Sequence, residues 1–210
     1  MSINSIALEN EANKLAKAMT PKLNPNCIDQ QDKTMSQDLA EIVKTHALGA
    51  AASGVGSGAA LAAMVGFIWS MYFRINYRLG LKFSKVAMKS LASAVLSNLM
   101  QSAISVVGSV ALATVLSLTG IGNAASSLIM AALDYSVVMV GGILYLKLLN
   151  GLMGAGNDPS EMTPREIEIR MDDVMRGENI EALLKNESRS YKAGRKNGTI
   201  TGNETVDIAN

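Results

Sequence analysis

The chain has 210 residues, of which 49% are hydrophobic and 18% charged, and its formal net charge is +1. This composition excludes a disordered protein, and the positive mean hydropathy places the chain near the boundary between soluble and membrane proteins. The small net charge hides an uneven pattern, because no acidic residue occurs between Glu41 and Asp134. The distribution of charge along the chain therefore has to decide between a soluble protein and a membrane protein.

The N-terminal region, residues 1–45, is polar and mixed in charge. Residues 6–19 form a weakly amphipathic helical pattern that ends at a proline-containing stretch, TPKLNPN. Thr34 and Gln37 have the spacing of a helix capping box, which predicts a second helix from Thr34. No cleavable signal peptide is expected, since acidic residues precede the first long apolar run.

Residues 46–156 form an apolar block without proline, which favours helices. We predict an all-α fold, namely a polytopic membrane protein whose three apolar helices lie within residues 47–73, 90–122 and 124–146. Runs of about 20 apolar residues cross a hydrocarbon core of about 30 Å. The turn sequence TGIGN, residues 119–123, predicts that the second and third segments form an antiparallel hairpin.

Small residues recur at every fourth position in the first two apolar segments, and such a stripe lets helix backbones approach closely. They are Ala50, Gly54, Gly58, Ala62 and Gly66 in the first segment, and Ser105, Ser109, Ala113 and Ser117 in the second. We interpret both stripes as helix-packing surfaces. A linker or re-entrant loop stays open for the first, because each interior glycine costs a helix about 0.8–1 kcal/mol.

Basic residues without any acid occupy residues 74–89: Arg74, Arg78, Lys82, Lys85 and Lys89. The positive-inside rule predicts a cytoplasmic loop there that contacts anionic lipid headgroups. Trp69 and Tyr72 beside Arg74 resemble an interfacial aromatic anchor. A solvated surface is the alternative, and no nucleic-acid partner is expected, because a soluble nucleic-acid binder would not need the adjacent apolar runs.

Asp134 lies in the middle of the third apolar segment. An acid in the middle of a membrane helix costs about 2.5–3.5 kcal/mol, so this side chain should face a partner group or water. Asn98, Gln101, a serine of the second segment or Asp134 of another subunit are candidate contacts. An interhelical hydrogen bond, a protonated buried acid, a proton or ion relay and a position at a water interface all stay open.

The C-terminal region returns to mixed charge. Thr163, Pro164 and Glu166 predict the start of a helix, with a capping box and a proline at the first helical position. Apolar residues continue at helical spacing, so residues 157–185 are expected to form amphipathic helices available to a soluble partner. Residues 186–210 are expected to be a mobile polar tail.

Catalytic patterns are missing from the sequence. With a single histidine, one chain cannot assemble a zinc site from the usual ligands. It contains no phosphate-binding loop, nucleophile elbow or H-E-x-x-H motif. We therefore expect no enzymatic activity, no cofactor and no metal.

Three stretches, IVKTHALGAAASG, WSMYFRINYRLG and GIGNAASSLIMAALDYSVVMVGGILYLKLL, resemble a bacterial membrane-associated helical domain of unknown function that follows Era-like GTPase domains. The resemblance covers residues 39–149 and rests on Ala/Gly-rich helices and a GIG turn. The chain departs from that family where it has GVGSGAALAAM in place of a proline and an acid. The resemblance implies the bacterial inner membrane and a GTPase acting in trans, and it supplies no functional residues.

The sequence thus predicts a non-enzymatic integral membrane protein that acts through helix association, as a homo- or hetero-oligomer, and through partner binding. Three alternatives remain. They are a small channel or transporter component that uses Asp134, a secreted pore-forming or translocator-like protein, and a soluble Ala/Gly-rich helical bundle.

Overall fold

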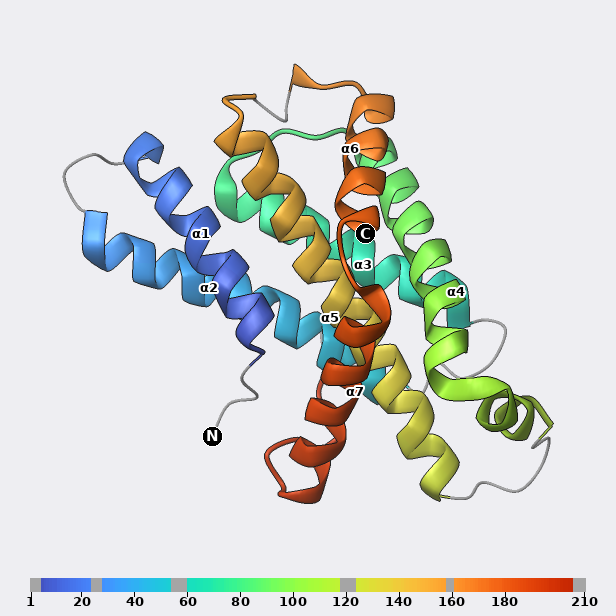
Figure 1. Cartoon of the computed structure of the whole chain (residues 1–210). Coiled ribbons are helices and arrows are strands. Elements are labelled where there is room, and N and C mark those ends of the chain that lie inside the picture. Colours follow the sequence, from blue (N-terminus) through green and yellow to red (C-terminus); the bar gives the residue numbers. More distant parts are fainter. Residues whose placement is uncertain (1–4, 24–27, 54–59, 118–123, 158–160, 206–210) are drawn as a thin grey trace.

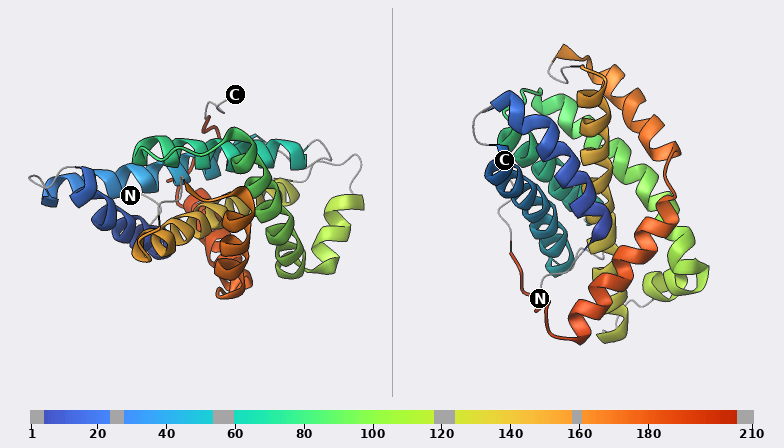
Figure 2. Two further views of the ribbon diagram at one scale, coloured as in Figure 1. Left: turned by 90° about the horizontal axis from the view of Figure 1, so that it is seen from above. Right: turned by 60° about the vertical axis from the view of Figure 1, so that its left-hand side comes forward.

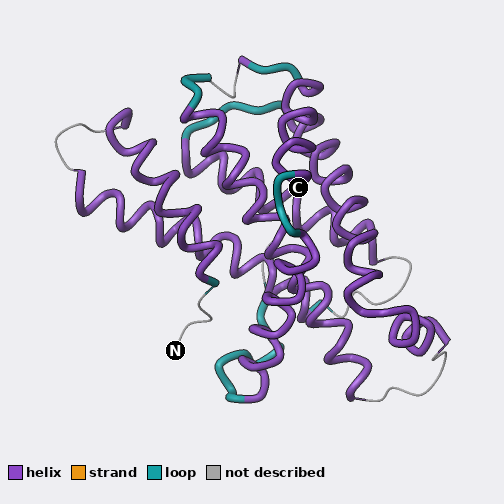
Figure 3. The backbone as a smooth tube through the Cα atoms, viewed as in Figure 1, coloured by secondary structure: helices purple, strands orange, loops and turns teal. Residues whose placement is uncertain are grey.

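The computed structural model describes residues 5–23, 28–53, 60–117, 124–157 and 161–205. Within these ranges the side chains of residues 20–23, 28–32, 60–62, 104–117 and 124–126 are not described. The described part consists of seven helices and their connections, without a strand (Figure 3). The all-α prediction is confirmed. The helices are α1 (Ile6–Leu23), α2 (Ile28–Ala52), α3 (Ala60–Leu79), α4 (Lys85–Ser117), α5 (Ala124–Gly154), α6 (Pro164–Arg176) and α7 (Ile180–Lys196).

Helix α5 lies at the centre of the bundle and contacts each of the other helices (Figure 1). Its residues 132–146 are buried without interruption. A helix that is apolar on all sides must be covered on all sides, and here the covering helices come from both ends of the chain. One core of buried residues extends from Leu8 to Ile200, so the four regions expected from composition share a single core.

One helix in the part of the chain with described side chains is long and apolar enough to cross a membrane, over Ser127–Gly154 of α5. Of the residues in its most apolar stretch, 72% are buried among the other helices. The core helix of a water-soluble bundle has the same length and composition, so α5 is weak evidence for a membrane span. The prediction of three membrane-spanning helices is not supported.

The first apolar segment is a pair of helices and not one helix. His46 Nε2 of α2 lies 3.2 Å from Ser70 Oγ of α3. Nearer the other ends of these helices, Arg78 Nε donates to Asp38 Oδ2 at 2.7 Å. These contacts make α2 and α3 antiparallel, so the chain reverses between Ala52 and Ala60. The glycine-rich residues 54–59 between the two helices lie outside the described residues.

The predicted small-residue stripe is therefore divided between two elements. Ala50 is buried in α2, and Gly66 lies in α3. Gly54 and Gly58 lie outside the described residues, and so does the side chain of Ala62 in α3. The second stripe, Ser105, Ser109, Ala113 and Ser117, lies in α4, where side chains are also not described.

Helices α4 and α5 are antiparallel, as the predicted hairpin requires. Tyr145 Oη of α5 lies 3.5 Å from Met88 Sδ in the first turns of α4. Further along, a Cβ added at Gly141 would lie 3.8 Å from Leu99 Cδ1. The predicted turn itself, residues 119–123, lies outside the described residues.

The start of α6 agrees with its sequence signature. Thr163 Oγ1 accepts a hydrogen bond from the Glu166 amide at 3.3 Å, and the Thr163 amide donates to Glu166 Oε2 at 2.8 Å. These reciprocal bonds satisfy amides that have no partner within the helix. The predicted capping box is confirmed.

The C-terminal helices pack inside the chain. Ile167 and Met171 of α6 are buried, and α7 continues to Lys196, well into the region expected to be a polar tail. The buried side of α7 consists of Leu184, Glu187, Tyr191 and Gly194. Because α5 covers both apolar faces, they are not left open for a soluble partner as predicted.

The N-terminal helices also differ from expectation. Helix α1 runs through Pro21 to Leu23, and α2 begins at Ile28, so Thr34 lies inside α2 and does not cap it. The two helices contact each other, with Ser36 Oγ donating to Asn13 Oδ1 at 2.6 Å. Packing between elements, which short-range sequence signals do not record, favours these longer helices.

Candidate functional site

Aromatic side chains line the outer face of α3. Trp69, Phe73 and Tyr77 are each four residues apart, which places them on neighbouring turns of one side of a helix. The Trp69 and Phe73 rings stack with centroids 6.2 Å apart. Phe73 is 36% exposed and Tyr77 is 82% exposed, and α3 lies along the outside of the bundle when seen from above (Figure 2).

The predicted basic loop is mostly helical. Arg74 and Arg78 lie in α3, Lys85 and Lys89 lie in the first turns of α4, and Lys82 lies in the short connection between them. Arg78 forms the ion pair with Asp38, so it holds α2 to α3. Lys82, Lys85 and Lys89 are exposed. The structure therefore presents Lys85 and Lys89 from a helix and Lys82 from the short connection.

The lysines and Tyr77, the last residue of the aromatic stripe, lie at the end of α3 that meets the start of α4. Asn76 Nδ2 lies 3.2 Å from Met88 Sδ, which brings the last turns of α3 against the first turns of α4. We call this surface the aromatic–basic face. Its exposed residues are Phe73, Tyr77, Lys82, Lys85 and Lys89, and the neighbouring Trp69 is partly buried against the core, with its indole nitrogen covered.

Tyr72 does not belong to this face, although it was expected to act with Trp69 as an anchor. Its hydroxyl donates to Gly141 O at 3.1 Å, and its ring stacks on Tyr145 with centroids 4.0 Å apart. Both tyrosines are fully buried. Burial raises the pKa of Tyr72 well above its ordinary value, and this side chain fastens α3 to α5.

Asp134 is buried between α5 and α7 and is 2% exposed. Its Oδ2 has no hydrogen-bond partner among the described residues. Burial raises its pKa to about 7, and its charge acts on Tyr191 of α7. Asn98 and Gln101, which were candidate contacts, are exposed on α4, and Asn98 Nδ2 donates to Ala94 O at 3.1 Å.

The single histidine is part of the core. His46 is 1% exposed, and its Nδ1 lies 2.7 Å from Ile42 O. Burial lowers its pKa, the hydrogen bond to Ile42 opposes that shift, and the charge of Arg74 adds to it. The neutral ring joins α2 to α3 through Ser70, so its role is structural.

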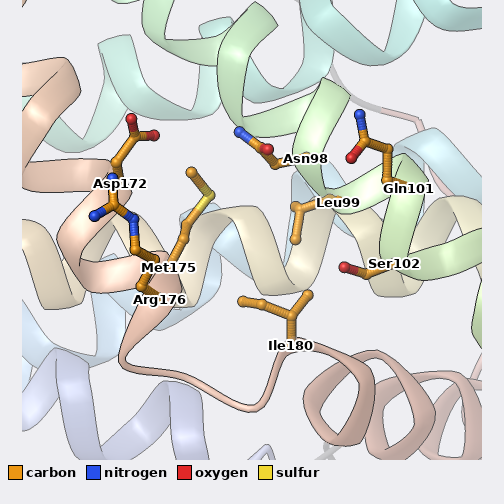
Figure 4. Close-up of a pocket in the computed structure, with 8 residues that line it drawn as sticks. All are labelled: Asn98, Leu99, Gln101, Ser102, Asp172, Met175, Arg176 and Ile180. Atoms are coloured by element: carbon orange, nitrogen blue, oxygen red, sulfur yellow. The ribbon is translucent and has the colours of Figure 1, made fainter.

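A cleft of about 430 Å³ lies between α4, α6 and the start of α7 (Figure 4). Asn98, Leu99, Gln101 and Ser102 line it from α4, Asp172, Met175 and Arg176 from α6, and Ile180 from α7. Binding sites for small molecules are mostly apolar with a few convergent polar groups. Polar groups dominate the lining of this cleft, so it differs from such sites.

No group of three or more His, Cys, Asp and Glu side chains that could hold a metal ion occurs among the described residues. The sequence analysis did not identify Phe73 and Tyr77 as surface residues of a possible site. It also did not identify Glu187 and Tyr191 as buried residues. The spacing of 69, 73 and 77 could have shown the aromatic stripe. Glu187 and Tyr191 lie in a segment whose polar composition predicts a solvated tail, so their burial could not be predicted.

Comparison with protein-family models, with curated proteins and with solved structures finds no match to this chain. The fold and the surface define the class: a helical bundle with a covered apolar central helix and an exposed aromatic–basic face.

Proposed function

We propose that this chain is a non-enzymatic protein that associates peripherally with an anionic membrane surface through its aromatic–basic face. The observation that carries the proposal is that two exposed aromatic residues, Phe73 and Tyr77, occur together with exposed lysines at the start of α4. No acidic residue occurs in residues 42–133, which contain the whole face. The exposed lysines complement a bilayer that contains anionic lipid, and the acids beside the face come from other helices, where Asp38 pairs with Arg78 and Glu168 accepts from Ser90 Oγ.

The energetics fit such an attachment. A lysine near an anionic bilayer contributes about 1 kcal/mol, and aromatic side chains favour the headgroup layer. Three lysines together contribute about 3 kcal/mol, which is about a hundredfold in the partition coefficient. Peripheral binding leaves α5 inside the bundle, where its apolar side chains are already covered.

The test is sedimentation with vesicles of phosphatidylcholine, alone or mixed with phosphatidylglycerol. We expect binding only to the anionic vesicles and a weakening of that binding with added salt. Replacing Lys82, Lys85 and Lys89 together by Gln should reduce the partition coefficient about a hundredfold. Tyr77→Ala should reduce it further.

The matched control replaces Lys185, Lys192 and Lys196 by Gln, which removes the same charge from exposed positions on α7. Equal losses in the two triple variants would contradict a localised face. Alkaline washing of cell membranes separates this proposal from an integral protein. Release of the chain is expected, and retention in the membrane pellet would show that α5 or other segments span the bilayer.

A further inference from the structure

Two carboxyl groups are buried at the interface between α5 and α7, one from each helix. Asp134 of α5 is 2% exposed and Glu187 of α7 is 4% exposed. Asp134 Oδ2, Glu187 Oε2 and Tyr135 Oη have no hydrogen-bond partner among the described residues. Such atoms are rare in native interiors and call for an explanation.

The groups around Glu187 stabilise its charge only in part. Ser5 Oγ, just before α1, donates to Glu187 Oε1 at 2.6 Å. Lys44 of α2 acts on Glu187 from a distance, but its Nζ pairs with Glu9 Oε1 of α1 at 3.2 Å. From α5, Tyr135 is the titratable group facing Glu187.

Asp134 has no ion-pair partner among the described residues. Tyr191 of α7 is the titratable group that feels its charge. The Tyr191 ring lies against Tyr135 with centroids 5.1 Å apart, which keeps the space apolar. Arg195 and Glu204 act on Tyr191 with opposite signs.

An ionised carboxylate without a cation in contact is far more costly to bury than the protonated acid. We propose that α7 docks on α5 in a pH-dependent way, staying packed while Asp134 and Glu187 are protonated and separating from α5 when they ionise. Separation would let water reach both carboxylates. It would also uncover the part of α5 that Leu184 and Tyr191 now contact, giving the bundle a second, more open form.

The direction of the pH dependence follows from burial. Burial raises the pKa of Asp134 from 3.8 to about 7. Burial also raises the pKa of Glu187, against the opposing effects of Ser5 and Lys44. Because the docked pKa values exceed the undocked ones, docking is strongest below the undocked pKa. It is lost as the pH rises through the docked pKa. For Asp134 alone the docking equilibrium constant should fall about tenfold between pH 6 and pH 8.

The experiment measures hydrogen-exchange protection factors of residues 180–196 at pH 6 and pH 8, each corrected for the intrinsic exchange rate. In the native sequence we expect about a tenfold loss of protection at pH 8, with residues 64–79 of α3 changing less. The double substitution Asp134→Asn and Glu187→Gln should remove this difference and keep α7 protected at both pH values. Neutral amides of the same shape avoid the charge penalty, so this variant is expected to fold, which circular dichroism checks.

The matched control is Asp173→Asn, which removes an exposed carboxylate from α6 and should leave the pH dependence unchanged. Equal protection of α7 at both pH values in the native sequence would overturn the proposal. So would a pH dependence that persists in the double variant, since other groups would then control the helix. A loss of protection spread evenly over all helices would also overturn it, because it would indicate global unfolding.

Discussion

At the residue scale, a close approach between helices occurs at a glycine that the small-residue stripes did not include. A Cβ added at Gly142 of α5 would lie 2.5 Å from Val43 Cγ1 of α2 and 3.1 Å from Met71 Sδ of α3. Val43 is fully buried, and a β-branched side chain has little rotamer freedom with which to yield. Gly142 therefore permits α2 and α3 to pack together against α5.

Gly142→Ala should destabilise the protein. Overpacking in a core costs about 1–3 kcal/mol, which exceeds the gain of about 1 kcal/mol that alanine brings to a helix interior. Urea unfolding should show a lower midpoint with an unchanged slope.

The matched control for this substitution is Gly151→Ala in the same helix. Gly151 is exposed, and an added Cβ there would meet nothing within 4 Å. The helix propensity of alanine should then raise the unfolding midpoint. A higher unfolding midpoint in both variants would mean that the core has room for a methyl group at Gly142.

At the element scale, the capping box at Thr163 was predicted correctly, whereas the predicted helix start at Thr34 and the extent of α7 were wrong. The capping box at Thr163 and Glu166 depends on four consecutive residues, so the sequence contains all the information. The extent of α7 depends on burial against α5, and its buried side includes Glu187 and Gly194, which look like surface residues in a sequence. The break between α2 and α3 lies in a glycine-rich stretch that fits a helix stripe and a linker equally well.

Thr163→Ala should shorten or fray α6. Losing a threonine N-cap costs about 1 kcal/mol, because the helix amides that it satisfies lose their partner. Hydrogen exchange of residues 165–167 should accelerate more than exchange elsewhere, since the effect begins at this terminus.

Thr163→Ser keeps the hydroxyl and serves as the matched control. It should leave exchange at the start of α6 close to that of the native sequence. Equal acceleration in the serine and alanine variants would show that the methyl group of Thr163, and not its capping oxygen, holds the terminus.

At the scale of the whole molecule, the sequence analysis did not predict that other helices of the same chain cover the apolar helix α5. Length and composition predicted three membrane-spanning helices, whereas in the structure α1, α2 and α7 cover the most apolar of them, α5. These helices come from residues 6–52 and 180–196. Pairing between such distant segments leaves no periodic pattern in the sequence of α5, whose apolar character is the same in either environment.

A central helix that contacts every other helix should make unfolding cooperative. Leu146 of α5 is fully buried, and Leu146→Ala should lower the free energy of unfolding by about 2–5 kcal/mol. Because one core joins the helices, protection against hydrogen exchange in α1, α2 and α7 should fall together at pH 6, where α7 stays docked. Ile169→Ala is the matched control, since Ile169 is 46% exposed on α6 and surface substitutions change stability by about 0.5 kcal/mol or less. If α1 and α2 kept their full protection in Leu146→Ala while α7 lost its own, the bundle would consist of two cooperative units, and α5 would not be its single centre.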